Sequence, residues 1–295
     1  MTTLAPEVTA LDVRPLSGTI GAEIRGVDVR ESLDPATVAE LRALWLRYKV
    51  VFFPEQHLEP HHQVAFARSF GALTRAHPVV PGLIDEHPEI LVLDAERARA
   101  SAEYAPARRR THDAGWHTDV TFVATPPTGS VLSGRVVPAA GGDTLWADTV
   151  AGYDTLDEPI RRLVDGLTAV HDGRRTFGGF LESGFAVEWD GERLESLEPT
   201  EHPVVQTHPE TGARSLFVNP QFTSHIVGLT GRDSEALLSL LYAHMTVPEL
   251  TVRHKWRAGD VAFWDNRTTM HYATLDYGYA PRVMHRVTLQ GGRPV

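Results

Sequence analysis

Two segments far apart in the chain supply side chains that together could bind a metal ion. His117 and Asp119 are two residues apart, and His271 lies much nearer the C-terminus. If Trp116 to Phe122 forms a strand, His117 and Asp119 point to the same face of it. Two histidines and one carboxylate on one side of an ion leave the opposite positions open, which suits non-haem Fe(II) and its oxygen chemistry. Because the chain has fifteen histidines, this pattern needs support from other residues.

A second set of candidates is the pair of arginines Arg282 and Arg286. In a strand over residues 282–289 the side chains alternate, so both arginines share one face with Met284. An arginine directed into the interior is costly unless an anion pairs with it. Its planar guanidinium suits carboxylate and sulfonate groups. The strand therefore predicts a site for one or two anionic groups; the alternative is an edge strand with two solvated arginines.

Composition limits the classes of function. The chain has 295 residues, of which 42% are hydrophobic and 22% charged, which is ordinary for a globular protein. A net charge of -10 argues against nucleic acid as a partner. With no cysteine, any metal must be bound by His, Asp or Glu. The first ten residues lack the apolar core of a signal peptide, and no run approaches the roughly 18 apolar residues of a membrane span. We therefore expect a cytoplasmic protein without a membrane partner.

Short strands between Gly and Pro turns dominate the sequence pattern, with a few amphipathic helices among them. Helices are expected over 35–49, from Pro60 to Gly71, from Asp157 to Leu163 and after Thr230. The expected strands include 50–53, 88–94, 130–136, 250–254, 261–264 and 282–289. This pattern predicts a mainly β fold with flanking α-helices, built as a barrel or jelly roll.

One stretch differs from the rest in composition. Residues 95–115 contain five arginines, several alanines and almost no large apolar side chain. This composition predicts a mobile loop or an irregular surface helix, and because the stretch directly precedes His117 it could act as a lid; a solvated loop is the alternative. No other stretch has the composition of a linker, so residues 1–295 are expected to form a single domain.

The chain resembles a known family in several motifs. The matching segments are Gly18 to Ile24, Trp116 to Phe122, Gly141 to Trp146 and Trp264 to Ala273, followed by Arg282 and Arg286. They resemble the taurine dioxygenase (TauD/TfdA) family, whose members are Fe(II)- and 2-oxoglutarate-dependent dioxygenases. The resemblance implies a double-stranded β-helix core and the use of Fe(II), 2-oxoglutarate and O2.

The resemblance also implies roles for individual residues. His117, Asp119 and His271 would be the iron ligands. Thr144 and Arg282 would bind the distal carboxylate of 2-oxoglutarate. Arg286 would lie beside the iron and the co-substrate, where it would contact the anionic head of the substrate.

Further positions match the substrate pocket of the family. His77 stands where taurine dioxygenases place a histidine that contacts the sulfonate, so His77 and Arg286 would form an anion site with two donors. The other residues expected to contact the substrate are Val80, Asp113, Val120, Phe177 and Phe222. The taurine enzyme has a tyrosine at the position of Val80 and an asparagine near Asp113. Because valine makes that end of the pocket less polar, we expect a larger or less polar alkanesulfonate or an alkyl sulfate rather than taurine.

The resemblance implies hydroxylation of a small anionic organic substrate, with an aldehyde and sulfite or sulfate as products beside succinate and CO2. Two alternatives lie within the same chemistry: an aryloxyalkanoate dioxygenase, and a hydroxylase of a biosynthetic intermediate. A third is a non-catalytic barrel that binds a metal or ligand, which the joint presence of His117, Asp119, His271, Thr144, Arg282 and Arg286 disfavours. Since the family includes dimers and tetramers, a homodimer or homotetramer is expected.

Overall fold

The largest sheet in the computed structural model has seven strands, in the order β1-β2-β3-β13-β5-β15-β4. The structure describes residues 11–78, 80, 82, 84–100, 115–177 and 197–295. In sheet order the strands are β1 Asp12–Pro15, β2 Ala22–Arg25, β3 Val50–Phe53, β13 Val261–Asp265, β5 Gly129–Val136, β15 Val283–Thr288 and β4 Leu91–Asp94. Neighbouring strands are antiparallel, with the exception of β2 and β3.

A smaller antiparallel sheet faces the large one. Its three strands, in the order β12-β6-β14, are Thr251–His254, Thr144–Asp148 and Thr269–Ala273. Trp146 of β6 lies edge-on against Phe52 of β3 and Trp264 of β13, with ring centroids 5.3 and 5.6 Å apart. These buried rings fill the space between the two sheets. The facing sheets form the jelly-roll core that the sequence predicts.

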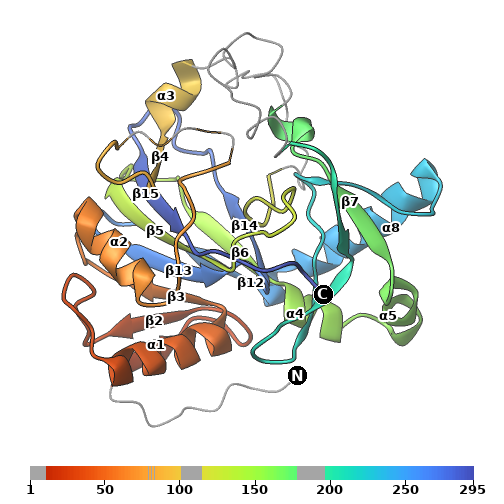
Figure 1. The fold of residues 1–295 in the computed structure, drawn as a ribbon, viewed down its shortest axis with the longest axis horizontal. Coiled ribbons are helices and arrows are strands. Elements are labelled where there is room, and N and C mark those ends of the chain that lie inside the picture. Colours follow the sequence, from red (N-terminus) through yellow and green to blue (C-terminus); the bar gives the residue numbers. More distant parts are fainter. Residues whose placement is uncertain (1–10, 79, 81, 83, 101–114, 178–196) are drawn as a thin grey trace.

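Two helices cover the outer face of the large sheet. α1 (Pro35–Tyr48) and α2 (Pro60–Arg68) lie against it, on the left of Figure 1. Because strand side chains alternate, Val51 and Phe53 point to these helices while Val50 and Phe52 point to the small sheet. Trp45 of α1 stacks on Phe263 of β13 at 4.3 Å.

A third layer covers the outer face of the small sheet. It contains α4 (Thr149–Asp154), α5 (Glu158–Val164), α8 (Gly231–Met245) and the 3-10 helix Pro248–Leu250. Its strands form two sheets: β11 Thr223–Ile226, β7 Thr168–His171 and β8 Thr200–Pro203 in one, and β10 Arg214–Leu216 with β9 Val205–Thr207 in the other. Leu241 and Met245 of α8 share a buried cluster with Ala147 of β6 and Met270 of β14. β6 therefore lies between two hydrophobic cores, because its Ala147 belongs to this cluster and its Trp146 to the cluster between the two sheets.

Most predicted elements are present, with bounds that differ by a few residues. The predicted strand from Trp116 to Phe122 is wrong, because only Trp116 and His117 form β-bridges there, the latter with His271, before the chain turns at Asp119. Of the stretch 95–115, predicted as a mobile loop or an irregular surface helix, residues Ala95–Ala100 form α3, and 101–114 lie outside the described residues.

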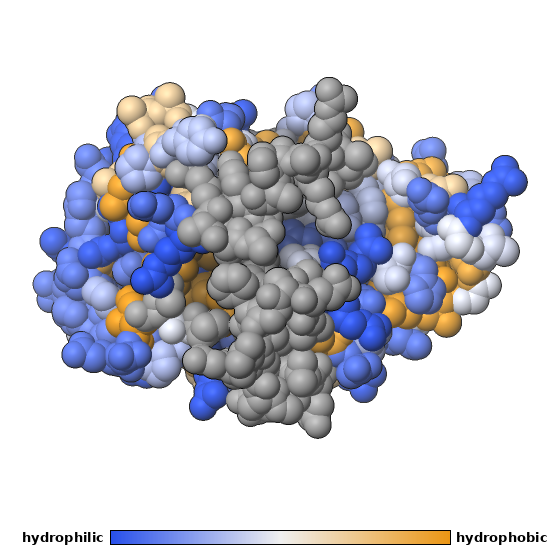
Figure 2. Space-filling view, turned by 90° about the horizontal axis from the view of Figure 1, so that it is seen from above, coloured by the Kyte–Doolittle hydropathy of each residue, from blue (hydrophilic) through white to orange (hydrophobic). Residues whose placement is uncertain are grey.

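The surface is mixed in polarity, and the helices are those of a globular fold. The face seen in Figure 2 carries hydrophilic side chains on both flanks, with smaller hydrophobic patches among them. Among the described helices, none combines the length and apolar character needed to cross a membrane.

Candidate active site

The backbone itself brings His117 and His271 together. His117 donates its N–H to the carbonyl of His271 at 2.9 Å, and His271 donates to the carbonyl of His117 at 2.7 Å. This reciprocal pair is an isolated antiparallel bridge to β14, so both imidazoles lie on the same side with ring centroids 4.1 Å apart. Thr118 adds a hydrogen bond from its hydroxyl to the carbonyl of Thr269 at 2.8 Å. Two candidate ligands are thus fixed by main-chain pairing.

Asp119 is placed by a turn rather than by a strand. The next residue, Val120, has a φ of 54°, a left-handed conformation that is rare for β-branched residues and costs about 1–3 kcal/mol. The Thr121 hydroxyl holds this turn, because it contacts Nδ1 of His171 at 2.9 Å and accepts from the Asn219 amide at 3.0 Å. The turn directs the Asp119 carboxylate back towards His271, whose Nε2 is 3.9 Å from Oδ1 of Asp119.

His117, Asp119 and His271 form a group that fits a metal ion. One donor atom from each lies within 4.8 Å of the other two. Nδ1 of His117 contacts the Gly115 carbonyl at 2.9 Å, which assigns Nε2 as its metal-binding nitrogen. Burial, together with neighbouring His117, lowers the pKa of His271 well below its ordinary value, so its imidazole is neutral as a metal ligand must be. Two imidazoles and a carboxylate are the donor set of non-haem Fe(II) sites.

Both oxygens of the Asp119 carboxylate are engaged. Ser130 of β5 donates its hydroxyl to Oδ2 at 2.6 Å, and Arg286 of β15 donates Nη1 to Oδ1. Burial would raise the pKa of Asp119, but the Arg286 guanidinium, His271, His117 and Ser130 outweigh it and lower the pKa to about 2. The carboxylate is therefore ionised and fixed before any metal binds. Nε of Arg286 is buried without a hydrogen-bond partner in the described part of the chain.

Arg282 immediately precedes β15, and Thr144 is the first residue of β6. Arg282 is 8% exposed, and among the described residues its guanidinium forms no ion pair; Nε donates to the Gly142 carbonyl at 3.2 Å. The nearby Asp143 carboxylate is paired with Arg253 instead, at 2.7 Å. Thr144 accepts a hydrogen bond from the Trp256 indole at 2.9 Å, so its own proton can be donated. Burial lowers the pKa of Arg282, and a buried cation of this kind needs an anion.

The Gly141-Gly142 turn allows Arg282 to come this close. Gly142 has a φ of +72°, and a Cβ at this position would lie 3.2 Å from Cδ and Nε of Arg282. An L side chain would be strained by the backbone conformation and would press on the guanidinium. Gly142, which is two residues before Thr144, therefore leaves the space that the Arg282 guanidinium occupies.

His77 has a defined hydrogen-bonding direction. Its Nδ1 accepts the backbone N–H of Val80 at 3.0 Å. Burial first, and then the nearby Arg286, lower the pKa of His77 to about 3. The ring is therefore neutral near pH 7, and with Nδ1 as acceptor its proton is on Nε2. His77 thus places a neutral imidazole near Arg286 without adding a second positive charge.

Aromatic side chains gather beside the metal group. The His77 ring lies 5.2 Å from Phe177 and 6.2 Å from Phe122, and the His117 ring lies 6.2 Å from Phe222. The cluster consists of Val120, Phe122, Phe177, Leu197 and Phe222, with Val80 and Val123 packed against it. The candidate residues Val80, Val120, Phe177 and Phe222 therefore share one apolar environment next to His117 and His77.

The family model described as taurine catabolism dioxygenase TauD, TfdA family matches residues 12–288. The chain belongs to this family.

Individual members of the TauD/TfdA family are similar over nearly the whole chain. An alpha-ketoglutarate-dependent sulfate ester dioxygenase of Pseudomonas putida is 44% identical, with 99% of this chain and 93% of that protein covered. An alkylsulfatase of Acinetobacter baylyi is 40% identical, with 99% and 89% covered. The crystal structure of a taurine dioxygenase from Burkholderia xenovorans superimposes with a TM-score of 0.81 at 44% identity, covering 97% of this chain and 91% of that one.

The fold of this TauD/TfdA protein gathers nine of the twelve candidate residues around the metal group, and it places Thr144 and Arg282 on either side of the Gly141-Gly142 turn. Asp113 lies outside the described residues. Sequence reasoning did not assign Ser130 or Leu197 to the site, and it named Phe122 only as part of a motif. Ser130 gave no signal, because a single serine in an apolar strand has no distinguishing pattern. Phe122 could have been assigned from its place three residues after Asp119.

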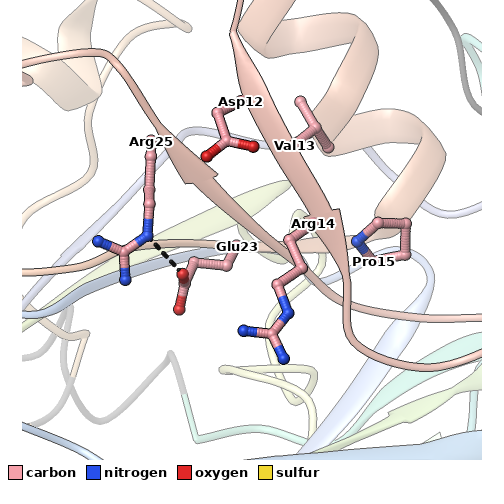
Figure 3. Close-up of a pocket in the computed structure, with 6 residues that line it drawn as sticks. All are labelled: Asp12, Val13, Arg14, Pro15, Glu23 and Arg25. Carbon is pink, nitrogen blue, oxygen red and sulfur yellow. Dashed lines mark hydrogen bonds and ion pairs between the residues drawn. The ribbon is translucent and has the colours of Figure 1, made fainter.

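A hollow elsewhere on the surface has no comparable chemistry. It lies on the β1-β2 hairpin and is lined by Asp12, Val13, Arg14, Pro15, Glu23 and Arg25 (Figure 3). The two arginines face two carboxylates there, and Arg25 donates to Glu23 at 2.7 Å. Because its charges neutralise one another on an exposed edge, this hollow is not a candidate site.

Proposed function

We propose that the protein is an Fe(II)- and 2-oxoglutarate-dependent dioxygenase that oxidises alkyl sulfate esters, and secondarily alkanesulfonates. The observation that carries this proposal is the pairing of two features at one metal group: the anion donors His77 and Arg286, and the apolar cluster of Val80, Val120, Phe122, Phe177, Leu197 and Phe222. A sulfate head with an alkyl chain has the same two parts. The similarity to a sulfate ester dioxygenase and an alkylsulfatase supports this substrate class.

In this proposal each group of residues binds a different component of the reaction. His117, Asp119 and His271 hold the iron, while Arg282 and Thr144 bind the distal carboxylate of 2-oxoglutarate. Nε of Arg286, which lacks a partner, and Nε2 of His77 bind the sulfate oxygens. The apolar cluster then receives the alkyl chain and excludes water from the carbon that bears the sulfate.

The bound iron would supply oxygen activation, with 2-oxoglutarate as the two-electron donor that is oxidised to succinate and CO2. One oxygen atom enters succinate and the other forms the hydroxyl on the carbon bonded to the sulfate oxygen. The hydroxylated ester then loses hydrogen sulfate and leaves an aldehyde. The protein contributes position: two anion donors fix the head, so that the first carbon of the chain faces the metal group.

The test is a panel of organic anions that differ in head group and chain length. Hexyl sulfate, hexanesulfonate, taurine and 2-phenoxypropionate are each supplied with Fe(II), ascorbate, 2-oxoglutarate and O2, and succinate, sulfate and sulfite are quantified by ion chromatography. Hexyl sulfate should give succinate and sulfate in equal amounts, at a higher kcat/KM than taurine. Succinate formation driven only by 2-phenoxypropionate would overturn the substrate class while leaving the cofactor assignment in place.

The anion site is tested separately. Arg286→Ala should lower kcat/KM for hexyl sulfate by about 10- to 100-fold, since a hydrogen bond to a charged group contributes about 1.5–3 kcal/mol. Arg135, a partly exposed arginine of β5 paired with Glu59, provides the control, and Arg135→Ala should leave turnover unchanged. Unchanged turnover in Arg286→Ala would contradict the assignment.

A further inference from the structure

A chain of buried hydrogen bonds reaches the metal-binding carboxylate from behind. Ser130 Oγ contacts Oδ2 of Asp119 at 2.6 Å, and the Asn266 amide Nδ2 contacts the same Ser130 oxygen at 2.9 Å. The Asn266 carbonyl oxygen in turn accepts the indole N–H of Trp264 at 2.9 Å. The four side chains are at most 2% exposed. They connect β13 and the turn after it, through β5, to Asp119.

The direction of every bond in this chain is determined. An indole nitrogen can only donate, so the Asn266 oxygen must face Trp264 and its NH2 group must face Ser130. The Ser130 oxygen therefore accepts from Asn266, and its one proton remains for Asp119. An ionised carboxylate can only accept, which suits this end of the chain. Each donor thus has one acceptor, and reversing any bond would leave a buried polar group without a partner.

We propose that Ser130, oriented by Asn266 and Trp264, is a positioning residue that fixes the Asp119 carboxylate with Oδ2 turned away from the metal and Oδ1 presented to it. The distances support this assignment, because Oδ1 is the oxygen that lies 3.9 Å from Nε2 of His271. The inference rests on the metal-binding part of the proposed function. It goes beyond it by naming residues that touch neither the metal nor the substrate.

The same arrangement acts on a second ligand. The Trp264 ring lies 4.9 Å from the His271 ring, so one indole packs against one ligand and, through Asn266 and Ser130, orients another. Partners of this kind fix the ligand orientation before binding, and their loss commonly costs about 10- to 100-fold in metal affinity. The hydroxyl of Ser130 should therefore matter to the metal even though it lies behind Asp119.

The test compares two serines of β5. Ser133 is as fully buried as Ser130, but its hydroxyl has no hydrogen-bond partner within the described residues. Co(II) is titrated anaerobically into the purified full-length chain, with affinity followed by calorimetry and ligand geometry by the visible d–d absorption of the metal. Ser130→Ala should weaken Co(II) binding by about 10- to 100-fold and change the absorption bands. Ser133→Ala should match the wild type in both.

Three results would overturn the inference. They are wild-type affinity and bands in Ser130→Ala, an equal loss in Ser133→Ala, or additive losses when Ser130→Ala is combined with Asn266→Ala. If Asn266 acts through Ser130, its substitution should have little further effect once the hydroxyl is gone. A wild-type protein that bound no Co(II) would instead refute the metal site itself, together with this inference.

Discussion

At the scale of single residues, the two buried arginines of the site differ in their hydrogen-bond and ion-pair partners. Arg286 is already paired with Asp119, whereas Arg282 forms no ion pair among the described side chains; it donates to the Gly142 carbonyl and lies over the Tyr277 ring. A buried guanidinium without a carboxylate is unfavourable until an anion arrives. Substituting Arg282 and substituting Arg286 should therefore affect different kinetic constants.

Arg282→Ala should raise the KM for 2-oxoglutarate by about 10- to 100-fold, because a charge-assisted hydrogen bond contributes about 1.5–3 kcal/mol. The KM for the sulfate ester should change little. Steady-state kinetics with each substrate varied in turn makes this measurement. If the sulfate ester KM rose and that of 2-oxoglutarate did not, the roles of the two arginines would have to be exchanged.

Val80 provides a residue-scale test of the pocket. Its side chain packs against the aromatic cluster, and its backbone N–H holds Nδ1 of His77. Val80→Tyr keeps that backbone bond but puts a phenol group into the apolar space. We expect a loss of about 10-fold or more in kcat/KM for hexyl sulfate, as overpacking costs about 1–3 kcal/mol, and a smaller loss for the shorter taurine. Val123→Ala, at the edge of the same cluster, is the comparison variant; equal losses for both substrates in Val80→Tyr would argue against a chain-binding role.

At the scale of elements, the turn from Asp119 to Val123 depends on a buried polar cluster. His171 of β7 is fully buried against Thr121. Burial, and then His202, lower the pKa of His171 from 6.5 to about 3. Between these two pH values the unfolded chain binds a proton that the folded protein excludes. The contribution of His171 to stability is therefore complete above about pH 6.5 and declines as the pH falls towards 3.

His171→Asn should reduce the acid sensitivity of the fold. The difference in the free energy of unfolding between pH 7.5 and pH 5, measured by urea denaturation, should be smaller in this variant than in the wild type. His225, an exposed histidine paired with β7 through Val170, offers the matched control, and His225→Asn should keep the wild-type difference. The same pH dependence in all three proteins would show that His171 does not titrate in this way.

The same elements show what the sequence could and could not predict. The helix over Pro35–Tyr48 was predictable because its signals are local: Asp34 accepts the N–H groups of Ala36 and Thr37. The strand predicted across Asp119 is wrong because the conformation of Val120 is stabilised by Asn219, which is 98 residues from Thr121 in the sequence. Periodicity carries no information about such a contact.

Candidate residues were predictable to the extent that they belong to motifs. His117, Asp119 and His271 stand in segments whose residue types resemble the family, and the structure brings them together. Ser130 became visible only in three dimensions, because its partner Asn266 is 136 residues away. A side chain that acts through another side chain has no characteristic spacing from it in the sequence, so no motif reveals it.

At the scale of the whole molecule, ligand binding should raise stability. A ligand that binds only the folded state adds about 2.7 kcal/mol at a concentration 100 times its Kd. Mn(II) with 2-oxoglutarate, used anaerobically to prevent turnover, should therefore increase the Tm of the wild type by a few degrees. Asp119→Ala should lose the increase from Mn(II), whereas Arg282→Ala should keep it and lose the increase from 2-oxoglutarate. An unchanged Tm in the wild type would contradict the metal assignment.

The reciprocal main-chain bridge between His117 and His271 has a consequence for how such a protein can change. The spacing of these two imidazoles is inherited from peptide hydrogen bonds, which do not depend on the identity of neighbouring side chains. The chain-binding cluster is contributed by separate segments around residues 80, 122, 177 and 222. Mutations can therefore change the pocket one segment at a time while the distance between the two imidazoles stays the same. Substrate specificity can change in this way without any change in the metal-binding geometry.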